Sequence, residues 1–80
     1  MRVLLFGPLQ DLAGWRERRF DPAPASLFGL RAILEEEAPA LVGALAAKGV
    51  QTAVNKTIVR GDLALAADAE VAFLPPMSGG

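Results

Sequence analysis

The sequence has 80 residues, of which 52% are hydrophobic and 21% charged, and its formal net charge is −1; this composition predicts one small folded domain whose partners are not nucleic acids. It contains no Cys, His or Tyr, so the common thiolate nucleophile, general base and metal ligands are missing, and neither independent catalysis nor a metal site is expected. No apolar run reaches the roughly 20 residues of a membrane-spanning helix, and no signal peptide precedes the first apolar segment, so we expect a cytoplasmic protein.

The first predicted element is a strand over Arg2–Phe6. Side chains alternate between the two faces of a strand, so Val3 and Leu5 are expected in the core. The opposite face then carries Leu4 and Phe6. Two large apolar side chains on an open face indicate either a binding patch or a second layer of helix that covers them.

A turn or short helical turn is predicted over Asp11–Gly14, and a second strand over Arg16–Asp21. The arginines of this strand are typical of solvated charges at a sheet edge, where they discourage unwanted pairing; contact with an acidic partner is the alternative. A long helix begins after Ser26, a good N-cap, and ends near Ala38, because Pro39 disfavours helical geometry in the residue before it. The expected core face of this helix consists of Leu27, Leu30, Ile33 and Leu34.

The segment after the long helix is predicted to form a second, short helix. Pro39 suits the first position of such a helix, because the proline lacks only an N–H that would have no partner there. The expected apolar stripe is Leu41, Val42 and Leu45, and Gly49 is the expected C-cap.

Two short strands are predicted next, over 50–54 and 57–59, with Asn55-Lys56 turning the chain between them. On the first of these strands Val50, Thr52 and Val54 are expected to share a face. A loop with two leucine anchors should connect this hairpin to the last strand, and those anchors are Leu63 and Leu65.

The last strand, over 70–74, is expected to place Val71 and Phe73 in the core and Ala72 and Leu74 on the opposite face. It can lie beside the first strand as the parallel centre of the sheet, with the long helix as a right-handed crossover. A hairpin, one long helix across a mixed sheet and a returning strand together indicate a compact α+β roll.

The chain after the last strand forms a short tail. Pro75 and Pro76 end the sheet, because proline has no N–H to donate, so the folded domain is expected over 1–75 and a flexible tail over 76–80. Two terminal glycines without a β-carbon would let a carboxylate enter a channel that excludes other residues, whereas an inert, frayed terminus is the alternative. The last four residues are Met77, Ser78, Gly79 and Gly80.

Three stretches of the sequence carry a family resemblance: Leu5–Gly14, Ala53–Val59 and Glu70–Gly80. Their most specific part is the ending Pro-Pro-x-Ser-Gly-Gly. The chain resembles the small subunit of molybdopterin synthase, in the MoaD/ThiS group of ubiquitin-like sulfur carriers, and this resemblance implies a β-grasp fold. The family often has Asp-Gly-Asp-Glu-Val before its last strand, whereas residues 67–71 of this chain read Ala-Asp-Ala-Glu-Val, without the turn glycine.

The resemblance also implies a role in molybdenum cofactor biosynthesis. A ubiquitin-activating-type enzyme would use ATP to adenylate Gly80, and a sulfur donor protein would convert the adenylate to a thiocarboxylate. The sulfur would then build the molybdopterin dithiolene in the large subunit, within a heterotetramer of two small and two large subunits. The chain itself would be a co-substrate that holds no cofactor stably, and its expected docking residues are Phe6, Ile58 and Leu74.

Three alternatives remain. The chain could carry sulfur for thiazole synthesis or tRNA thiolation, with the same activation step and a different acceptor. It could instead be a ubiquitin-like protein modifier, in which Gly80 forms an isopeptide bond with a lysine. It could also be a plain interaction module with an inert tail.

Overall fold

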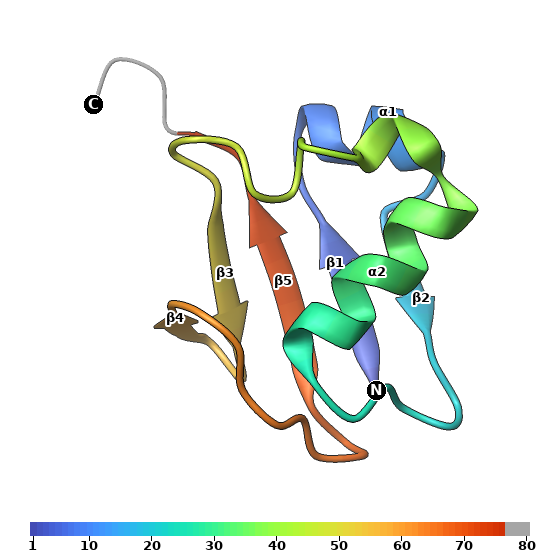
Figure 1. The fold of residues 1–80 in the computed structure, drawn as a ribbon, viewed down its shortest axis with the longest axis vertical. Helices are drawn as coiled ribbons and strands as arrows, with labels where there is room; N and C mark the ends of the chain where they lie inside the picture. The colour runs from blue at the N-terminus through green and yellow to red at the C-terminus, as the bar shows by residue number, and fades with distance from the viewer. Residues whose placement is uncertain (77–80) are drawn as a thin grey trace.

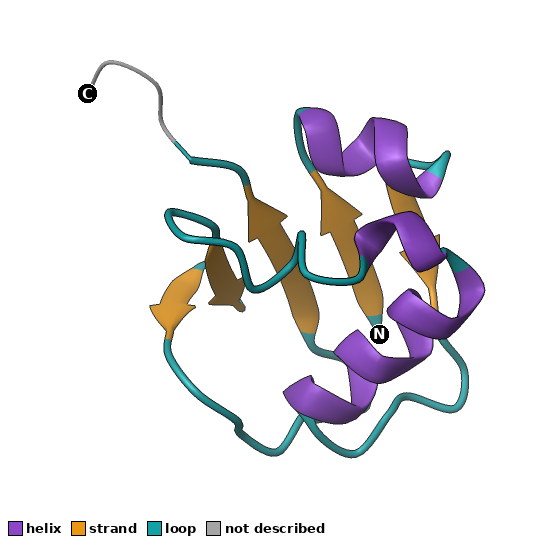
Figure 2. Ribbon diagram, turned by 45° about the horizontal axis from the view of Figure 1, so that its top comes forward, coloured by secondary structure: helices purple, strands orange, loops and turns teal. Residues whose placement is uncertain are grey.

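The computed structural model describes residues 1–76 of the chain. They form a five-stranded sheet with helices packed against one face, as Figure 1 and Figure 2 show from two directions. No helix among these residues is long and apolar enough to cross a membrane. In chain order the elements are β1 (Arg2–Leu5), α1 (Pro8–Ala13), β2 (Glu17–Arg19), α2 (Leu27–Glu37), the 3₁₀-helix η1 (Pro39–Leu41), β3 (Gln51–Val54), β4 (Thr57–Val59) and β5 (Glu70–Leu74).

The strand order is β2-β1-β5-β3-β4, and only the central pair, β1 and β5, runs parallel. A parallel pair needs a crossover connection, and here α2 lies in that connection and crosses the face of the sheet that is turned to the viewer in Figure 1. The mixed sheet with one long helix across it confirms the predicted β-grasp roll.

The core lies between the central strands and α2. Val3 and Leu5 of β1 and Val71 and Phe73 of β5 are all fully buried, so the predicted alternation is confirmed on both strands. Leu63 and Leu65 of the connecting loop pack against this core, as expected from the sequence. The helical side contributes Leu9, Leu27, Leu30, Leu34, Leu41 and Leu45.

The long helix begins where the sequence predicts. The hydroxyl of Ser26 accepts a hydrogen bond from the backbone N–H of Gly29 at 3.1 Å. The N–H of Phe28 donates to the Asp62 carboxylate at 2.8 Å, and the N–H of Leu27 donates to the carbonyl of Leu63 at 2.9 Å. The first turn of α2 is therefore satisfied by its own cap and by the loop before β5.

Ser26→Ala removes the side-chain acceptor and leaves the N–H of Gly29 without this partner. The expected loss in the free energy of unfolding is about 1 kcal/mol, measured as a lower urea midpoint at an unchanged m-value. Ser26→Thr keeps an acceptor at the cap and is the control. An alanine variant as stable as the wild type would show that the cap contributes nothing here.

The segment after α2 differs from the prediction. It contains a single 3₁₀ turn at η1 in place of a second short helix, and the predicted stripe residue Val42 is 64% exposed. Gly43 adopts a φ of 81° directly after it, so the helical period stops before it can bring Val42 to the core. Leu41 and Leu45 are buried as expected.

Two smaller predictions also need correction. The turn expected over Asp11–Gly14 is a six-residue helix, α1, which begins at Pro8. Ile33 of the expected core face is only half-buried, because the core side of α2 is the narrower set Leu27, Leu30 and Leu34.

The β3–β4 turn fixes the position of the outer hairpin. Asn55 and Lys56 have φ values of 51° and 68°, the left-handed pair that suits the twist of a two-residue hairpin. Asn55 also exchanges two hydrogen bonds with Glu70, through its N–H at 2.8 Å and its side-chain oxygen at 2.9 Å. The turn before β5 forms without the family's glycine, through a bond of 3.1 Å from the N–H of Ala69 to the carbonyl of Ala66.

Candidate functional site

The face of the sheet opposite α2 carries an apolar row. The strand registers pair Leu4 with Ala72, Ala72 with Ala53, and Ala53 with Ile58. Residues directly opposite one another on paired strands point to the same side of the sheet, so this row crosses β1, β5, β3 and β4. Ile58, at its outer end, is 46% exposed.

A second row extends the apolar surface toward the end of β5. Leu74 is half-buried and pairs with Gln51 of β3. Phe6 follows β1 two residues after Leu4 and is therefore on the same face; its N–H donates to the carbonyl of Phe73 at 3.3 Å, and 39% of it is exposed. We call the surface made by Leu4, Phe6, Ile58, Ala72 and Leu74 the apolar patch.

The opposite end of this face is polar. Arg2 contacts Glu17 of β2 at 3.1 Å and Glu70 of β5 at 3.2 Å. The hydrogen bond to Glu17 and the negative charge of that carboxylate raise the pKa of Arg2. Of the patch residues, Phe6 and Leu74 lie at the end of the sheet from which the chain leaves after β5, whereas Ile58 lies on the outer strand β4.

The two prolines that follow β5 rest against glycines from other parts of the chain. Gly7, between β1 and α1, lies so close to Pro75 that an added β-carbon would meet the ring Cγ at 3.0 Å. Gly49, in the loop before β3, lies so close to Pro76 that an added β-carbon would meet its Cβ at 2.9 Å. Strand β5 ends at Leu74, as the prolines predict.

The predicted docking residues Phe6, Ile58 and Leu74 thus lie on one face, although they come from three different strands or strand ends. The predicted tail residues Met77, Ser78, Gly79 and Gly80 lie outside the described residues. The contacts of the two glycines with the prolines are not predicted from the sequence. Gly49 is expected there only as a helix cap, and a local pattern can indicate a positive φ but not a contact with a proline in another part of the chain.

One of the three arginines at the sheet edge, Arg18, has contacts that the sequence does not predict. Arg18 was expected as a solvated charge, yet its guanidinium lies 4.6 Å from the ring centre of Phe20 and 5.4 Å from that of Trp15. It also forms an ion pair with Glu37 at the end of α2. Arg18 therefore joins β2 to the helix layer, while Arg16 and Arg19 are exposed as expected.

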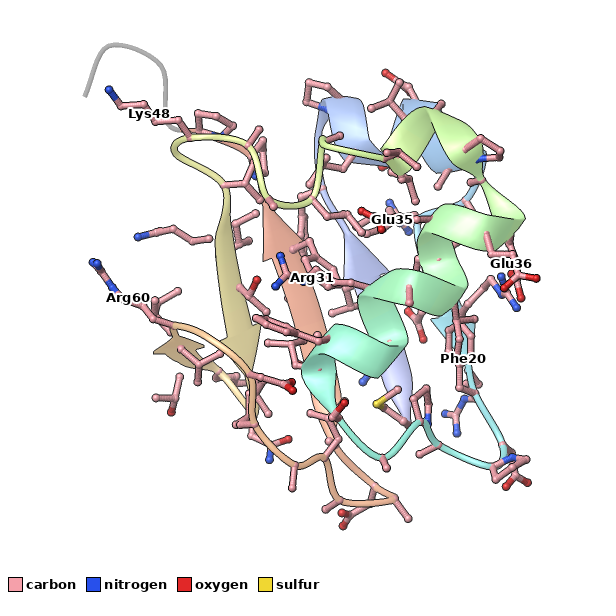
Figure 3. All side chains as sticks on the ribbon, viewed as in Figure 1. Phe20, Arg31, Glu35, Glu36, Lys48 and Arg60 are labelled. Atoms are coloured by element: carbon pink, nitrogen blue, oxygen red, sulfur yellow. The ribbon has the colours of Figure 1, made fainter. Side chains whose placement is uncertain are left out.

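A cavity of ≈ 400 Å³ lies between the start of α2 and the β3–β4 hairpin. Its lining includes Leu27, Arg31, Val59 and Arg60. Figure 3 shows Arg31 on α2 and Arg60 beyond β4. Among residues 1–76, no group of three or more carboxylate, His or Cys side chains is arranged to hold a metal ion.

The ThiS family matches the sequence over residues 3–80. The chain belongs to the ThiS family. Its fold is that of the crystal structure of SAMP1 from Haloferax volcanii, with a TM-score of 0.82 and 28% sequence identity over 99% of this chain and 97% of that one. The solution structure of small archaeal modifier protein 1 from Methanosarcina acetivorans matches with a TM-score of 0.82 and 22% identity, over 99% and 94% of the two chains. Among curated proteins, the comparison finds no significant match to this chain.

These findings identify the chain as a ubiquitin-like β-grasp protein of the ThiS family. Two residues of the apolar patch, Phe6 and Leu74, lie at the end of the sheet where the chain leaves β5.

Proposed function

We propose that this ThiS-family protein is the small, sulfur-carrying subunit of a molybdopterin synthase. The observation that carries the proposal is the apolar patch beside the strand end from which a Gly-Gly tail continues. The family match through residue 80 supports a tail that belongs to the functional unit. In this proposal the patch docks the partner, and the tail delivers Gly80 to the partner's catalytic residues.

The proposed chemistry begins at the carboxylate of Gly80. A carboxylate is a poor acceptor for a nucleophile, so an activating enzyme transfers the AMP group of ATP to it and releases pyrophosphate. Sulfide supplied by a sulfur donor protein then attacks the acyl carbon, AMP leaves, and a thiocarboxylate with one sulfur in place of one oxygen remains. The chain has no Cys, so it has no thiol of its own that could capture the activated acyl group.

The second proposed stage takes place in the large subunit. The thiocarboxylate sulfur attacks a carbon of the pterin precursor there and displaces an oxygen leaving group, and water then cleaves the acyl–sulfur bond, which leaves the sulfur on the pterin and restores the Gly80 carboxylate. Two such transfers supply the two sulfurs of the molybdopterin dithiolene, within an assembly of two small and two large subunits. Both the activating enzyme and the large subunit dock on Phe6, Ile58 and Leu74, because apolar residues near an interface centre dominate binding. Loading and delivery therefore alternate, and all catalytic residues and the ATP site belong to the partners.

A second candidate, protein modification, is favoured by one specific observation. The structure that shares 28% identity with this chain is that of SAMP1 from Haloferax volcanii. The full name of SAMP1 is small archaeal modifier protein 1. A modifier would share the adenylation step and then transfer Gly80 to a lysine amine. Sulfur transfer to thiazole or to tRNA would likewise share activation and differ only in the acceptor.

The proposed function is tested by intact-mass measurement after incubation with an activating enzyme, ATP and a sulfur source. Because the chain has no Cys, any thiol that reacts with an alkylating reagent has been added. We expect a mass change of one oxygen replaced by one sulfur plus one alkyl group, mapped to Gly80. Alkylation is needed because an oxidised Met1 or Met77 changes the mass by nearly the same amount as the sulfur exchange.

Each outcome of this experiment assigns a function. An alkylated Gly80 that then forms molybdopterin with the large subunit supports the proposal, and one that serves only another acceptor contradicts its second stage. Gly-Gly adducts on lysines without an alkylated thiol favour the modifier. An unchanged mass, under conditions that load an established carrier, contradicts the carrier function.

Ile58→Asp places a charge in the apolar patch and is expected to weaken docking. A central apolar contact contributes about 2 kcal/mol or more to binding, so KM for the carrier should rise about 30-fold in the ATP–pyrophosphate exchange of the activating enzyme. Because Ile58 is 46% exposed, the fold should survive the change.

The matched control is Val42→Asp, which places the same charge at a residue that is 64% exposed and lies outside the patch. We expect its KM to match that of the wild type. Equal effects of both substitutions would show that the patch has no special role in docking.

A further inference from the structure

The two glycines that contact the proline pair form a structural unit, which we call the glycine cradle: Gly7 against Pro75 and Gly49 against Pro76. An ideal β-carbon at Gly7 would lie 3.0 Å from Cγ of Pro75. One at Gly49 would lie 2.9 Å from Cβ and 3.1 Å from Cγ of Pro76. A β-carbon at Gly49 would force a shift of Pro76, and one at Gly7 would require the ring of Pro75 to give way by a few tenths of an ångström.

The cradle glycines differ from the other left-handed glycines of the chain. Gly7 and Gly49 have φ values of 57° and 88°, so each position favours glycine for its backbone as well. Gly14, Gly43 and Gly61 also have positive φ values, of 85°, 81° and 74°, but a β-carbon added to any of them would meet nothing within 4 Å. A positive φ therefore does not by itself bring a glycine against a proline, and the contacts of Gly7 and Gly49 are a separate feature of these two positions.

The cradle is continuous with the apolar patch. Gly7 directly follows Phe6 after β1, and Pro75 directly follows Leu74 at the end of β5. In each of these two segments a patch residue is therefore the chain neighbour of a cradle residue. Gly49 lies two residues before Gln51, which pairs with Leu74. In Figure 1 the loop before β3 and the start of α1 lie on the two sides of the end of β5.

The proline pair is suited to transmit this geometry to the tail. Each proline fixes its own φ near −65°, and each restricts the residue before it, which here means Leu74 and Pro75. With both rings seated on glycines, little freedom remains at the point where the chain leaves the domain. The position of Pro76, the residue from which the tail continues, is thereby held relative to Phe6 and Leu74.

We propose that Gly7 and Gly49 are positioning residues that aim the C-terminal tail for the reaction at Gly80. This inference rests on the proposed function, because it assumes that a partner docks on the patch and acts on the tail. Docking on the patch positions the partner on the domain. The cradle then positions the start of the tail relative to the docked partner. A misplacement of about 1 Å at a reacting group can cost about 100-fold in rate, so a displaced proline pair lowers kcat although docking is intact.

Gly49→Ala and Gly43→Ala make a matched comparison. Both force alanine into a left-handed φ, 88° and 81° respectively, but only the first pushes a β-carbon against Pro76. In ATP–pyrophosphate exchange at saturating carrier, we expect Gly49→Ala to lower kcat tenfold or more with KM unchanged. Gly43→Ala should retain both constants, and the loss in melting temperature should be larger for Gly49→Ala, where the β-carbon also meets Pro76.

Pro76→Gly provides a second route to the same answer if Gly49→Ala does not fold. It removes the ring from the cradle without adding a β-carbon to Gly49, and the expected result is again a lower kcat at unchanged KM. In the double variant Gly49→Ala/Pro76→Gly, the alanine should cause no further loss of kcat, because the atom it would displace is gone.

The outcomes separate the cradle from the proposed function. If the wild-type chain is not adenylated at all, the proposed function fails, and the positioning role fails with it. If the wild type is adenylated and Gly49→Ala and Pro76→Gly retain its kcat, the cradle is overturned while the proposed function stands. A rise in KM at constant kcat would also overturn it, because the glycines would then act on docking.

Discussion

Phe73→Ala is expected to lower the free energy of unfolding by about 3–5 kcal/mol, the largest stability effect of any single substitution considered for this chain. Phe73 is fully buried and lies on β5, which is hydrogen-bonded to β1 on one side and to β3 on the other. Removing its ring leaves a cavity between the centre of the sheet and α2, where the surrounding strands cannot move inward without breaking their ladders. A domain of this size is stable by only about 4–12 kcal/mol, so the substitution removes about a quarter or more of that stability.

The matched control for this prediction is Phe28→Ala. Phe28 is the same residue type, but it is 45% exposed on α2 and contacts the guanidinium of Arg31 at 4.3 Å from the ring centre. Its loss should cost about 1 kcal/mol or less, the range of an exposed cation–π contact and partial burial. Urea unfolding followed by circular dichroism gives both values, and similar losses for Phe28 and Phe73 would contradict the core described here.

The parts of the fold that the sequence predicts correctly depend on local signals. Val3, Leu5, Val71 and Phe73 alternate with outward-facing residues at the strand period, so their burial follows from the pattern alone. Ser26 is recognised as a cap because its hydroxyl acts within three residues of its own position.

The incorrect predictions arise where a distant or neighbouring element overrides the local pattern. Val42 fits a helical stripe, but the left-handed backbone at Gly43 ends the helical period before the stripe is built. The sequence around Arg18 is typical of an exposed edge, but the guanidinium of Arg18 lies over the aromatic rings of Trp15 and Phe20. It also pairs with the carboxylate of Glu37, which lies 19 residues away in the sequence.

The candidate site shows the same division. That Leu4, Phe6 and Leu74 face away from the core follows from alternation on their own strands. That Ile58 joins them depends on strand pairing, because the two-residue turn at Asn55 and Lys56 sets the register that places Ile58 opposite Ala53. The cradle lies beyond local prediction, because each of its contacts joins a glycine to a proline in a different part of the chain.

Deletion of Gly79 and Gly80 is expected to abolish the formation of an alkylatable thiol by the activating enzyme, ATP and a sulfur source. The shortened chain still ends in a carboxylate, now on Ser78. Each residue spans at most about 3.3–3.6 Å, however, so this carboxylate ends about 7 Å short of the reacting position. A misplacement of about 1 Å can already cost about 100-fold in rate, so a shortfall of this size should leave no measurable product in the intact-mass assay.

The control for the deletion is Met77→Ala, which keeps the length of the tail, both glycines and the terminal carboxylate. It should be loaded with sulfur, because the reacting group still reaches the partner's site. The deletion variant should match the wild type in its urea midpoint, since the core and the ladders of the sheet are formed within residues 1–76. A carrier and a modifier both need the terminal glycine at the partner's reaction centre, so a deletion variant that retains full activity in cells would contradict both and assign the chain as an interaction module with an inert tail.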